Sequence, residues 1–330
     1  MTKTSGPKRA TSWDVARLSG FSRSTVNEIL NGRGERFPEA TRARVHQAVD
    51  ELAYAPSPAG RGLVTGRGST VVVLVPAGTL PPLFQDSIVE LQAVLSSRGF
   101  HVLVQFGISD SDAIVTDLRM LAPVAIVNFN VLAPGAAEQL RRTGVVVVPD
   151  SGESELDEFD VHVGSMLVQT LVERVGRRRL LFARPADAVD YPSGMGRFRG
   201  ALQAAAELRL DPPTLVEVPL DVATAARILE PVLSHDKPTS IACQVDVVAL
   251  AVLAACRELG LEVPSEVAIM GVDATPESQL WSPRLTTFRI DQGEVGRGLG
   301  ANLISAIDGD EAGAHAAGFP QLRVVEGDTA

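Results

Sequence analysis

The sequence predicts an all-α helix-turn-helix head joined to an α/β body of two doubly wound parallel-sheet lobes. Two short helical patterns separated by a glycine turn occupy residues 14–30. From residue 70 onward, short runs rich in valine, isoleucine and leucine alternate with helical patterns, which is typical of buried parallel strands joined by helices. This alternation occurs in two series of similar size. A chain of 330 residues with 45% hydrophobic side chains can form two or three compact units of this kind.

The head begins with a helix that should end before Gly20 and a second helix that should open on Ser22. Gly20 can adopt the positive φ that a tight turn between helices needs. The Ser22 hydroxyl is suited to accept a hydrogen bond from a backbone N–H of the first helical turn. Apolar residues recur at helical spacing and should face one another between the helices: Val15, Ala16, Phe21, Val26, Ile29 and Leu30.

The outward side chains of the second helix form a polar set, namely Arg23, Ser24, Asn27 and Glu28. A helix-turn-helix presents such a set to base edges in the major groove of DNA. Arg23 is best suited to guanine, Ser24 suits several bases, and Glu28 suits the amino group of cytosine. Two alternatives remain open. Helical periodicity by itself favours an ordinary αα-hairpin, and Glu28 also fits a solvated charge held away from phosphate.

The head resembles the opening of the lactose-repressor (LacI/GalR) family. The resemblance is carried by Thr11-x-x-Asp14-Val15-Ala16, Ser19-Gly20-Phe21-Ser22-x-x-Thr25-Val26 and Leu30-Asn31-Gly32. A third helix is expected from Pro38 to Tyr54, with a proline where relatives have a serine cap. The resemblance implies further contacts to the DNA backbone from Thr11, Ser22, Thr25 and Asn31.

Charge differs between the head and the rest of the chain. The formal net charge is −10, yet residues 1–67 carry eleven basic and six acidic side chains, so the head is +5 and the remainder −15. Phosphate attraction acts within a Debye length of about 8 to 10 Å, so a basic head can bind DNA while an acidic body limits nonspecific adhesion.

Residues 56–69 follow the head and are rich in proline and glycine, a composition that predicts a flexible linker. In the family, this place holds a hinge helix that orders on DNA, and Gly60-Arg61-Gly62-Leu63 resembles its core. The resemblance implies that Leu63 enters the minor groove as an apolar wedge, with Arg61 beside it. Each glycine costs about 0.8 to 1 kcal/mol of helix stability relative to alanine, so this hinge should depend on DNA and on dimer packing.

The body should contain two series of strands and helices. Strands are expected at residues 71–75, 102–106, 124–127 and 145–148, all fully buried, and at 180–182, 215–218, 240–243, 267–270 and 285–290. Helices are expected at residues 84–97, 112–121, 134–142, 197–208, 223–234, 247–259 and 294–308. The expected domains are a head (1–55), a hinge (56–69) and an effector-binding and dimerisation body (70–330). Lobe 1 comprises about 70–160 and 291–318, and lobe 2 comprises about 161–290 and 319–330.

The body resembles the periplasmic-binding-protein-like core of the same family. In relatives, the arginine of an Arg-x-x-Gly element and the aspartate after Gly-Val grip the effector, which implies Arg197 and Asp273 here. Asp246 and Phe84 complete the expected effector site. As an alternative, Arg197 and Asp273 pair only with each other. Other landmarks depart from the family pattern, so a sugar effector is less assured: Pro81-Pro82-Leu83-Phe84, Gly164-Ser165, Val245-Asp246 and Glu326-x-Asp328-Thr329.

The sequence also predicts that the chain is not a metalloprotein, an exported or membrane protein, or an enzyme. Cys243 and Cys256 lack CxxC spacing, and the five histidines are scattered, so no metal or cofactor is expected. No signal peptide or run of about 18 apolar residues occurs, which predicts a soluble cytoplasmic protein. Gly296-x-Gly298-x-x-Ala301 outlines a dinucleotide fingerprint but falls within a helical pattern, and no Walker or GxSxG motif appears. The chain is therefore not expected to be an enzyme, and no catalytic residue is predicted.

Together these features predict a transcriptional regulator, a repressor that binds a near-palindromic DNA operator as a homodimer or higher oligomer. A small polar metabolite such as a sugar is the expected effector. One alternative is a stand-alone small-molecule binding protein, which would require export. Another is an activator, which depends on where the operator lies relative to the promoter.

Overall fold

The structure is a computed structural model that describes residues 10–30, 34–54, 68–75, 82–107, 111–129, 131–148, 155–186, 194–233, 236–310 and 320–330. The predictions for Asn31, Arg61 and Leu63 lie outside the described residues, and so does the side chain of Phe84. The chain divides into two compact units, Met1–Ser69 and Thr70–Ala330.

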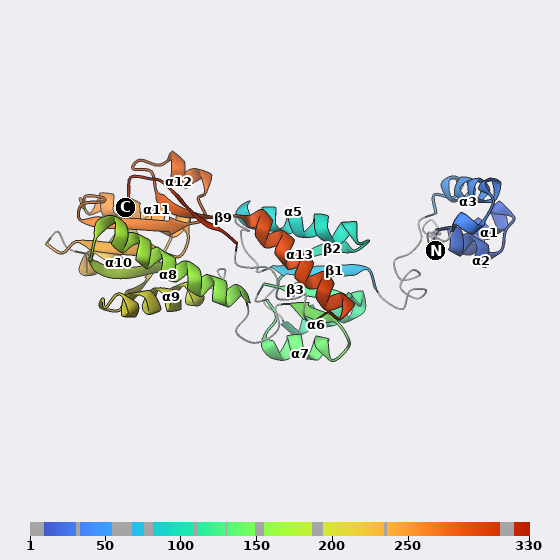
Figure 1. Cartoon of the computed structure of the whole chain (residues 1–330), viewed down its shortest axis with the longest axis horizontal. Helices are drawn as coiled ribbons and strands as arrows, with labels where there is room; N and C mark the ends of the chain where they lie inside the picture. Colours follow the sequence, from blue (N-terminus) through green and yellow to red (C-terminus); the bar gives the residue numbers. More distant parts are fainter. Residues whose placement is uncertain are drawn as a thin grey trace, which may run out of the picture. The chain divides into compact units, whose positions relative to one another are not determined.

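The first unit contains a helix-turn-helix followed by a third helix (Figure 1). Its elements are α1 (Ser12–Ser19), α2 (Arg23–Leu30), the 3-10 turn η1 (Gly34–Arg36) and α3 (Glu39–Glu51). The prediction for the turn is confirmed, because Gly20 has a φ of 76° and the Ser22 hydroxyl accepts a 3.1 Å hydrogen bond from the backbone N–H of Thr25. A reciprocal cap, in which Thr11 and Asp14 each bond the other's backbone N–H, begins α1.

The third helix forms although Pro38 occupies its cap position and supplies no side-chain capping bond. The prediction that this helix reaches Tyr54 is wrong. The helix stops at Glu51 because Ala53 takes a left-handed conformation, with a φ of 44°. The three helices enclose a small apolar core formed by Val15, Ala16, Val26, Ile29, Val45 and Ala48.

The second unit contains two sheets, and the first is a four-stranded parallel sheet in the order β2-β1-β3-β4. Its strands are β1 (Thr70–Val75), β2 (His101–Phe106), β3 (Ala125–Asn128) and β4 (Val146–Val148). Valines at alternate positions of β1 pack against α5 (Pro82–Ser97) and α13 (Gln292–Asp308) on one face. Val72 and Leu74 pack against α6 (Ser111–Leu121) and α7 (Pro134–Arg141) on the other, so the sheet is doubly wound.

The prediction that all four strands of this sheet are fully buried is wrong at both edges. In β4, Val146 and Val148 are half-buried. Strand β2 was expected to be fully buried, but it lies at the sheet edge, where Leu103 and Phe106 are 43% and 49% exposed. An apolar run has the same appearance in a central strand and in an edge strand, since strand order follows from the tertiary fold.

The second sheet has six strands in the order β10-β9-β8-β7-β5-β6. These strands are β5 (Arg179–Pro185), β6 (Thr214–Val218), β7 (Thr239–Cys243), β8 (Val267–Val272), β9 (Thr286–Ile290) and β10 (Leu322–Val325), of which β10 runs antiparallel to β9. One face packs against α8 (Glu155–Val175) and α9 (Gly194–Glu207). The other packs against α10 (Val222–Leu229) and α11 (Asp246–Glu258).

The sequence interpretation missed α8, α12 (Pro276–Leu280) and β10. The signal for α8 was present, because its buried residues follow helical spacing: Phe159, Val163, Leu167, Val168 and Leu171. The short elements α12 and β10 depend on long-range contacts and have weak local signals.

Helices α13 and α5 lie side by side, although about 200 residues separate them in the sequence (Figure 1). A Cβ on Gly296 would lie 2.2 Å from the carbonyl oxygen of Ser87, and one on Gly300 would lie 2.8 Å from Cγ1 of Val94. The fingerprint-like segment therefore lies within a helix, where Gly296 and the neighbouring Gly300 permit close helix packing. No helix in the described part of the chain has both the length and the apolar composition that crossing a membrane requires.

Candidate nucleic-acid interface and ligand site

The polar set of the head lies on α2, away from the buried Val26 and Ile29. Arg23 and Ser24 are exposed, and Asn27 and Glu28 are half-buried. The expected outward direction of this set follows from the 3.6-residue period, because Val26 and Ile29 anchor the opposite face in the core. The arrangement offers hydrogen-bonding side chains on one exposed helical face.

Arg23 is held by two residues of α1. Its Nε donates a 3.1 Å hydrogen bond to the hydroxyl of Ser12, and its Cζ lies 5.5 Å from the centre of the Trp13 ring. The Trp13 side chain is 66% exposed, so this cation–π contact lies on the surface of the head. Neither Ser12 nor Trp13 was recognised from the sequence as a partner of Arg23.

Glu28 forms an ion pair with Arg36 of η1. The pair joins the end of α2 to the turn that precedes α3, and it compensates the negative charge that Glu28 brings to a basic surface. The sequence suggested that Glu28 either reads a base or is a solvated charge. Neither interpretation included Arg36 as its partner.

Three other predicted contact residues of the head lie at helix N-termini, namely Thr11, Ser22 and Thr25. The Thr11 hydroxyl donates a 2.7 Å hydrogen bond to Asp14, and the Ser22 and Thr25 hydroxyls are 2.9 Å apart at the start of α2. Helix N-termini present backbone N–H groups and a positive dipole end, both of which attract phosphate.

The predicted ligand residues of the second unit gather at the carboxyl ends of the central strands of the six-stranded sheet. Arg197 lies in the first turns of α9, and its side chain is 8% exposed. Its Nε donates a 3.0 Å hydrogen bond to Asp160 of α8, and its Nη1 donates to the backbone carbonyl of Gln244 after β7. Arg197 thus pairs with Asp160 in the described structure, and the alternative of an exclusive pair with Asp273 does not hold.

Close packing of α8 against α9 brings Arg197 to Asp160. A Cβ on Gly164 would lie 1.8 Å from the carbonyl oxygen of Arg197, and one on Gly200 would lie 1.8 Å from the carbonyl oxygen of Val161. Any side chain at either position would force the helices apart. Gly164, which departs from the family pattern at the sequence level, is therefore required by the packing of this chain.

Asp273 follows β8 and is the most perturbed acid of this region. Its backbone has a φ of 115°, an uncommon conformation for a residue other than glycine. Burial raises the pKa of its carboxyl group to about 7, against the lowering effect of the nearby Arg197 charge; the charges of Asp246 and Asp160 also raise it. The carboxyl group can therefore exist in both protonation states near neutral pH.

Asp246 begins α11 and is completely buried. One carboxylate oxygen accepts a 2.5 Å hydrogen bond from the Thr287 hydroxyl, and the other accepts a 2.8 Å bond from the backbone N–H of Thr275. Burial raises its pKa, while these hydrogen bonds act in the opposite direction. The carboxylate thus ties the segment after β8, which carries Asp273, to β9.

Gln244 is a second feature that sequence reasoning missed. Its side chain is completely buried, and neither amide atom has a hydrogen-bond partner in the described structure. Leaving a buried polar group unpaired is unfavourable, so such a group beside Arg197 is typical of a functional site. A glutamine gives no local pattern that would have identified it.

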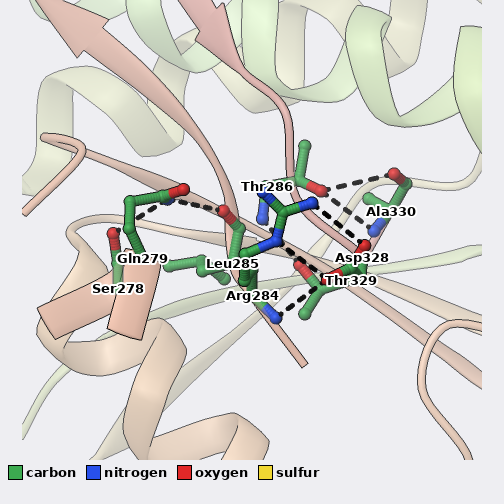
Figure 2. Close-up of polar contacts among 8 residues, drawn as sticks. All are labelled: Ser278, Gln279, Arg284, Leu285, Thr286, Asp328, Thr329 and Ala330. Carbon is green, nitrogen blue, oxygen red and sulfur yellow. Dashed lines mark hydrogen bonds and ion pairs between the residues drawn. The ribbon is translucent and has the colours of Figure 1, made fainter. Parts of the chain in front are cut away.

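The final residues of the chain pair within the second unit (Figure 2). The Arg284 side chain donates hydrogen bonds to Asp328, and the Thr329 hydroxyl accepts a 2.9 Å bond from the backbone N–H of Thr286. Glu326 pairs with Arg174. Figure 2 also shows Gln279 of α12 donating to the carbonyl of Leu285. The departure from the family pattern at Glu326 and Asp328 therefore accompanies contacts that fasten this segment to the rest of the unit.

The residues that the structure describes contain no candidate metal centre. In the described ranges, no three side chains of histidine, cysteine, aspartate or glutamate are grouped so that they could hold an ion. Cys243 and Cys256 are free and buried.

Two family models match the chain. Residues 13–57 match the bacterial regulatory proteins of the lacI family, and residues 168–330 match a periplasmic binding protein-like domain. The first match covers α2, α3 and nearly all of α1, and the second covers all six strands of the second sheet.

Curated relatives extend over nearly the whole chain. The HTH-type transcriptional repressor PurR of Aliivibrio fischeri (strain MJ11) is 28% identical over 302 residues, which cover 87% of this chain and 89% of that protein. The HTH-type transcriptional repressor CytR of Escherichia coli (strain K12) is 26% identical over 319 residues, which cover 92% of each.

Solved structures show the same fold. The lac repressor dimer bound to operator and the anti-inducer ONPF aligns with a TM-score of 0.77 at 20% identity, covering 98% of this chain and 99% of that one. The complex of the transcriptional regulator CelR with cellobiose aligns with a TM-score of 0.64 at 21% identity, covering 98% of this chain and 100% of that one.

Proposed function

The chain belongs to the lacI family of bacterial regulatory proteins, and on this premise we propose that it represses transcription as a dimer whose DNA affinity is set by a small-molecule effector. It is a sequence-specific DNA-binding transcriptional regulator. The observation that carries the DNA-binding part is the exposed polar face of α2, held rigid by the turn at Gly20 and by a core of three helices.

For the DNA contacts, Arg23, Ser24, Asn27 and Glu28 are the base-reading set, with Glu28 acting in concert with Arg36. Thr11, Ser22 and Thr25 meet phosphates at the helix N-termini. The parts assigned to Asn31, Arg61 and Leu63 rest on sequence resemblance, and so does the hinge.

An apolar surface of the second unit supports dimerisation. Helix α11 contacts both α10 and α12. The surface comprises large exposed side chains on or beside these three helices: Leu220, Val222, Val247, Leu280 and Trp281. Leu280 is 85% exposed and the adjacent Trp281 is 41% exposed, and grouped exposed apolar side chains are typical of protein–protein interaction sites. A second copy of the chain is the occupant we propose, because a symmetric dimer matches a near-palindromic operator.

The effector site consists of Arg197 and Asp273, with Gln244 supplying an unused donor and acceptor. Asp246 acts as a positioning residue for the segment that carries Asp273. Phe84 remains an expected apolar contact on the basis of sequence. Suitable effectors are small polar molecules with both donor and acceptor groups, such as sugars and nucleobases.

Regulation follows from linkage between effector and DNA. An effector changes DNA affinity only if it binds two arrangements of the body with different affinities, and such coupling is typically about 1 to 3 kcal/mol. A regulator of this kind acts in the cytoplasm beside the DNA and needs no catalytic residue.

The test is selection of bound sequences from a random DNA pool by the full chain, with competitor DNA present at moderate ionic strength. We expect an inverted repeat whose half-sites lie about one helical turn apart. The variant Leu280→Arg should lower the dimer fraction and the affinity for the full repeat, while a single half-site is bound as before. Recovery of no preferred sequence would refute the proposed function. If a preferred sequence is recovered, a thermal-shift screen of sugars and nucleobases would identify the effector.

A further inference from the structure

We propose that Trp13 and Ser12 of α1 fix the guanidinium of Arg23 in the orientation that reads guanine, which makes Trp13 a positioning residue for base recognition. The inference rests on the proposed function, because it requires α2 to be the reading helix. It adds residues of the first helix to the determinants of sequence preference.

The hydrogen-bonding pattern of Arg23 supports this role. A guanidinium has five N–H groups in a planar fork, and the Ser12 hydroxyl accepts from Nε alone, at 3.1 Å. The two terminal nitrogens keep their four N–H groups for other acceptors. Guanine presents two acceptors, N7 and O6, on its major-groove edge, and two parallel N–H groups match them. Ser12 therefore binds the part of the guanidinium that guanine does not need.

The ring of Trp13 restricts the plane of the guanidinium. The Cζ atom of Arg23 lies 5.5 Å from the ring centre, within range of a cation–π contact. A free arginine side chain must lose rotamer freedom when it binds a base, and ordering it beforehand reduces this loss. Ser12 and Trp13 together thus leave Arg23 fewer orientations before DNA arrives.

Packing of the head gives no other reason for a tryptophan at this position. Its side chain is 66% exposed, and the buried side of α1 is formed by Val15, Ala16 and Ser19. A large apolar residue so exposed contributes little to folding. Its contact with Arg23 explains why a tryptophan lies on the surface at this position.

The experiment measures base preference of the full chain by competitive binding against a set of operators that differ at single positions. The variants are Trp13→Leu, Trp13→Phe, Ser12→Ala, Arg23→Ala and the double variant of Trp13→Leu with Arg23→Ala. Trp13→Leu should lower discrimination at the base read by Arg23 about 2- to 5-fold, the range of a surface cation–π contact. Trp13→Phe keeps an aromatic face and should restore most of it, and Ser12→Ala should reproduce the loss in part.

The double variant separates positioning from direct contact. If Trp13 acts through Arg23, Trp13→Leu has no further effect on base preference once Arg23 is alanine. Arg44→Met is the matched control, because Arg44 of α3 makes another cation–π contact of the head, at 5.4 Å from the Phe21 ring. This control should leave base preference unchanged, and far-ultraviolet circular dichroism should show that the head of every variant is folded.

Three results would overturn the inference. Trp13→Leu could weaken binding to every sequence in the same proportion, which would indicate a contact of the ring with the DNA backbone. Its effect on preference could persist in the Arg23→Ala background. The unmodified chain could select no sequence at all, in which case the proposed function fails as well.

Discussion

Gly164 of α8 contacts the backbone of Arg197 in α9 so closely that a Cβ on the glycine would lie 1.8 Å from the arginine's carbonyl oxygen. The contact sets the separation of the two helices, and with it the 3.0 Å hydrogen bond between Arg197 and Asp160. A residue without a functional group thereby determines where the predicted effector-binding arginine lies.

The variant Gly164→Ala should destabilise the second unit by about 1 to 3 kcal/mol, the usual cost of overpacking, and should lower effector affinity by displacing Arg197. Urea unfolding followed by circular dichroism measures the first effect. Gly135→Ala is the matched control, because a Cβ on this helical glycine of α7 meets no atom within 4 Å. That variant should be neutral or slightly more stable. Equal stability of the two variants would contradict the packing argument.

The variant Arg36→Ala should weaken DNA binding at every sequence by about 3- to 10-fold at low salt, because it leaves the Glu28 carboxylate uncompensated beside phosphate. The double variant with Glu28→Gln removes that charge and should recover most of the lost affinity. Titration at several salt concentrations distinguishes this charge effect from unfolding. A double variant as weak as Arg36→Ala would show that Arg36 acts directly on the DNA.

The variant Asp246→Ala should lower the free energy of unfolding by roughly 2 to 4 kcal/mol, because it leaves the Thr287 hydroxyl and the Thr275 N–H unpaired in the interior. Effector affinity should fall too, since the segment carrying Asp273 loses its attachment to β9. Thr287→Val removes only the hydroxyl and should show part of both effects. If Asp246→Ala abolished effector binding while leaving stability unchanged, Asp246 would be a direct ligand.

Asp273 should make the stability of the chain depend on pH. Its pKa is about 7 in the folded chain and about 3.9 in an unfolded one, so the folded state binds more protons between these values. The contribution of Asp273 to the free energy of unfolding should then fall as pH rises from about 4 to about 7.

The variant Asp273→Asn cannot lose this proton and tolerates the positive φ. Between pH 5 and pH 8, the Tm of this variant should change less than the Tm of the unmodified chain. The two changes should differ by roughly a few °C. Asp328→Asn serves as control, because the hydrogen bonds from Arg284 lower the pKa of Asp328, and it stays charged throughout this range. Parallel Tm profiles for Asp273→Asn and the unmodified chain would refute the assignment.

Local signals explain the parts of the fold that the sequence predicted. The turn at Gly20, the hydroxyl cap at Ser22 and the amphipathic period of α2 each depend on residues within one or two helical turns. The βα alternation of the body is likewise local, because crossover helices must separate parallel strands. Resemblance to the family then identified Arg197 and Asp273 as the expected effector-binding residues.

Relations between distant residues were not predictable in this way. The edge position of β2, the pairing of Asp160 with Arg197 over 37 residues and the buried attachment of Asp246 all depend on strand order and helix packing. The unpaired Gln244 amide was equally invisible, since its environment comes from several elements.

The sequence by itself determined that this protein has a helix-turn-helix head and a body of two βα series, because periodicity, capping and turn chemistry act between near neighbours. Only the tertiary structure decided which polar groups meet. It gave Arg23 its Ser12 and Trp13 partners, Arg197 its carboxylate and Asp246 its buried hydrogen bonds, because each of these contacts joins separate elements whose approach is set by packing in the folded chain.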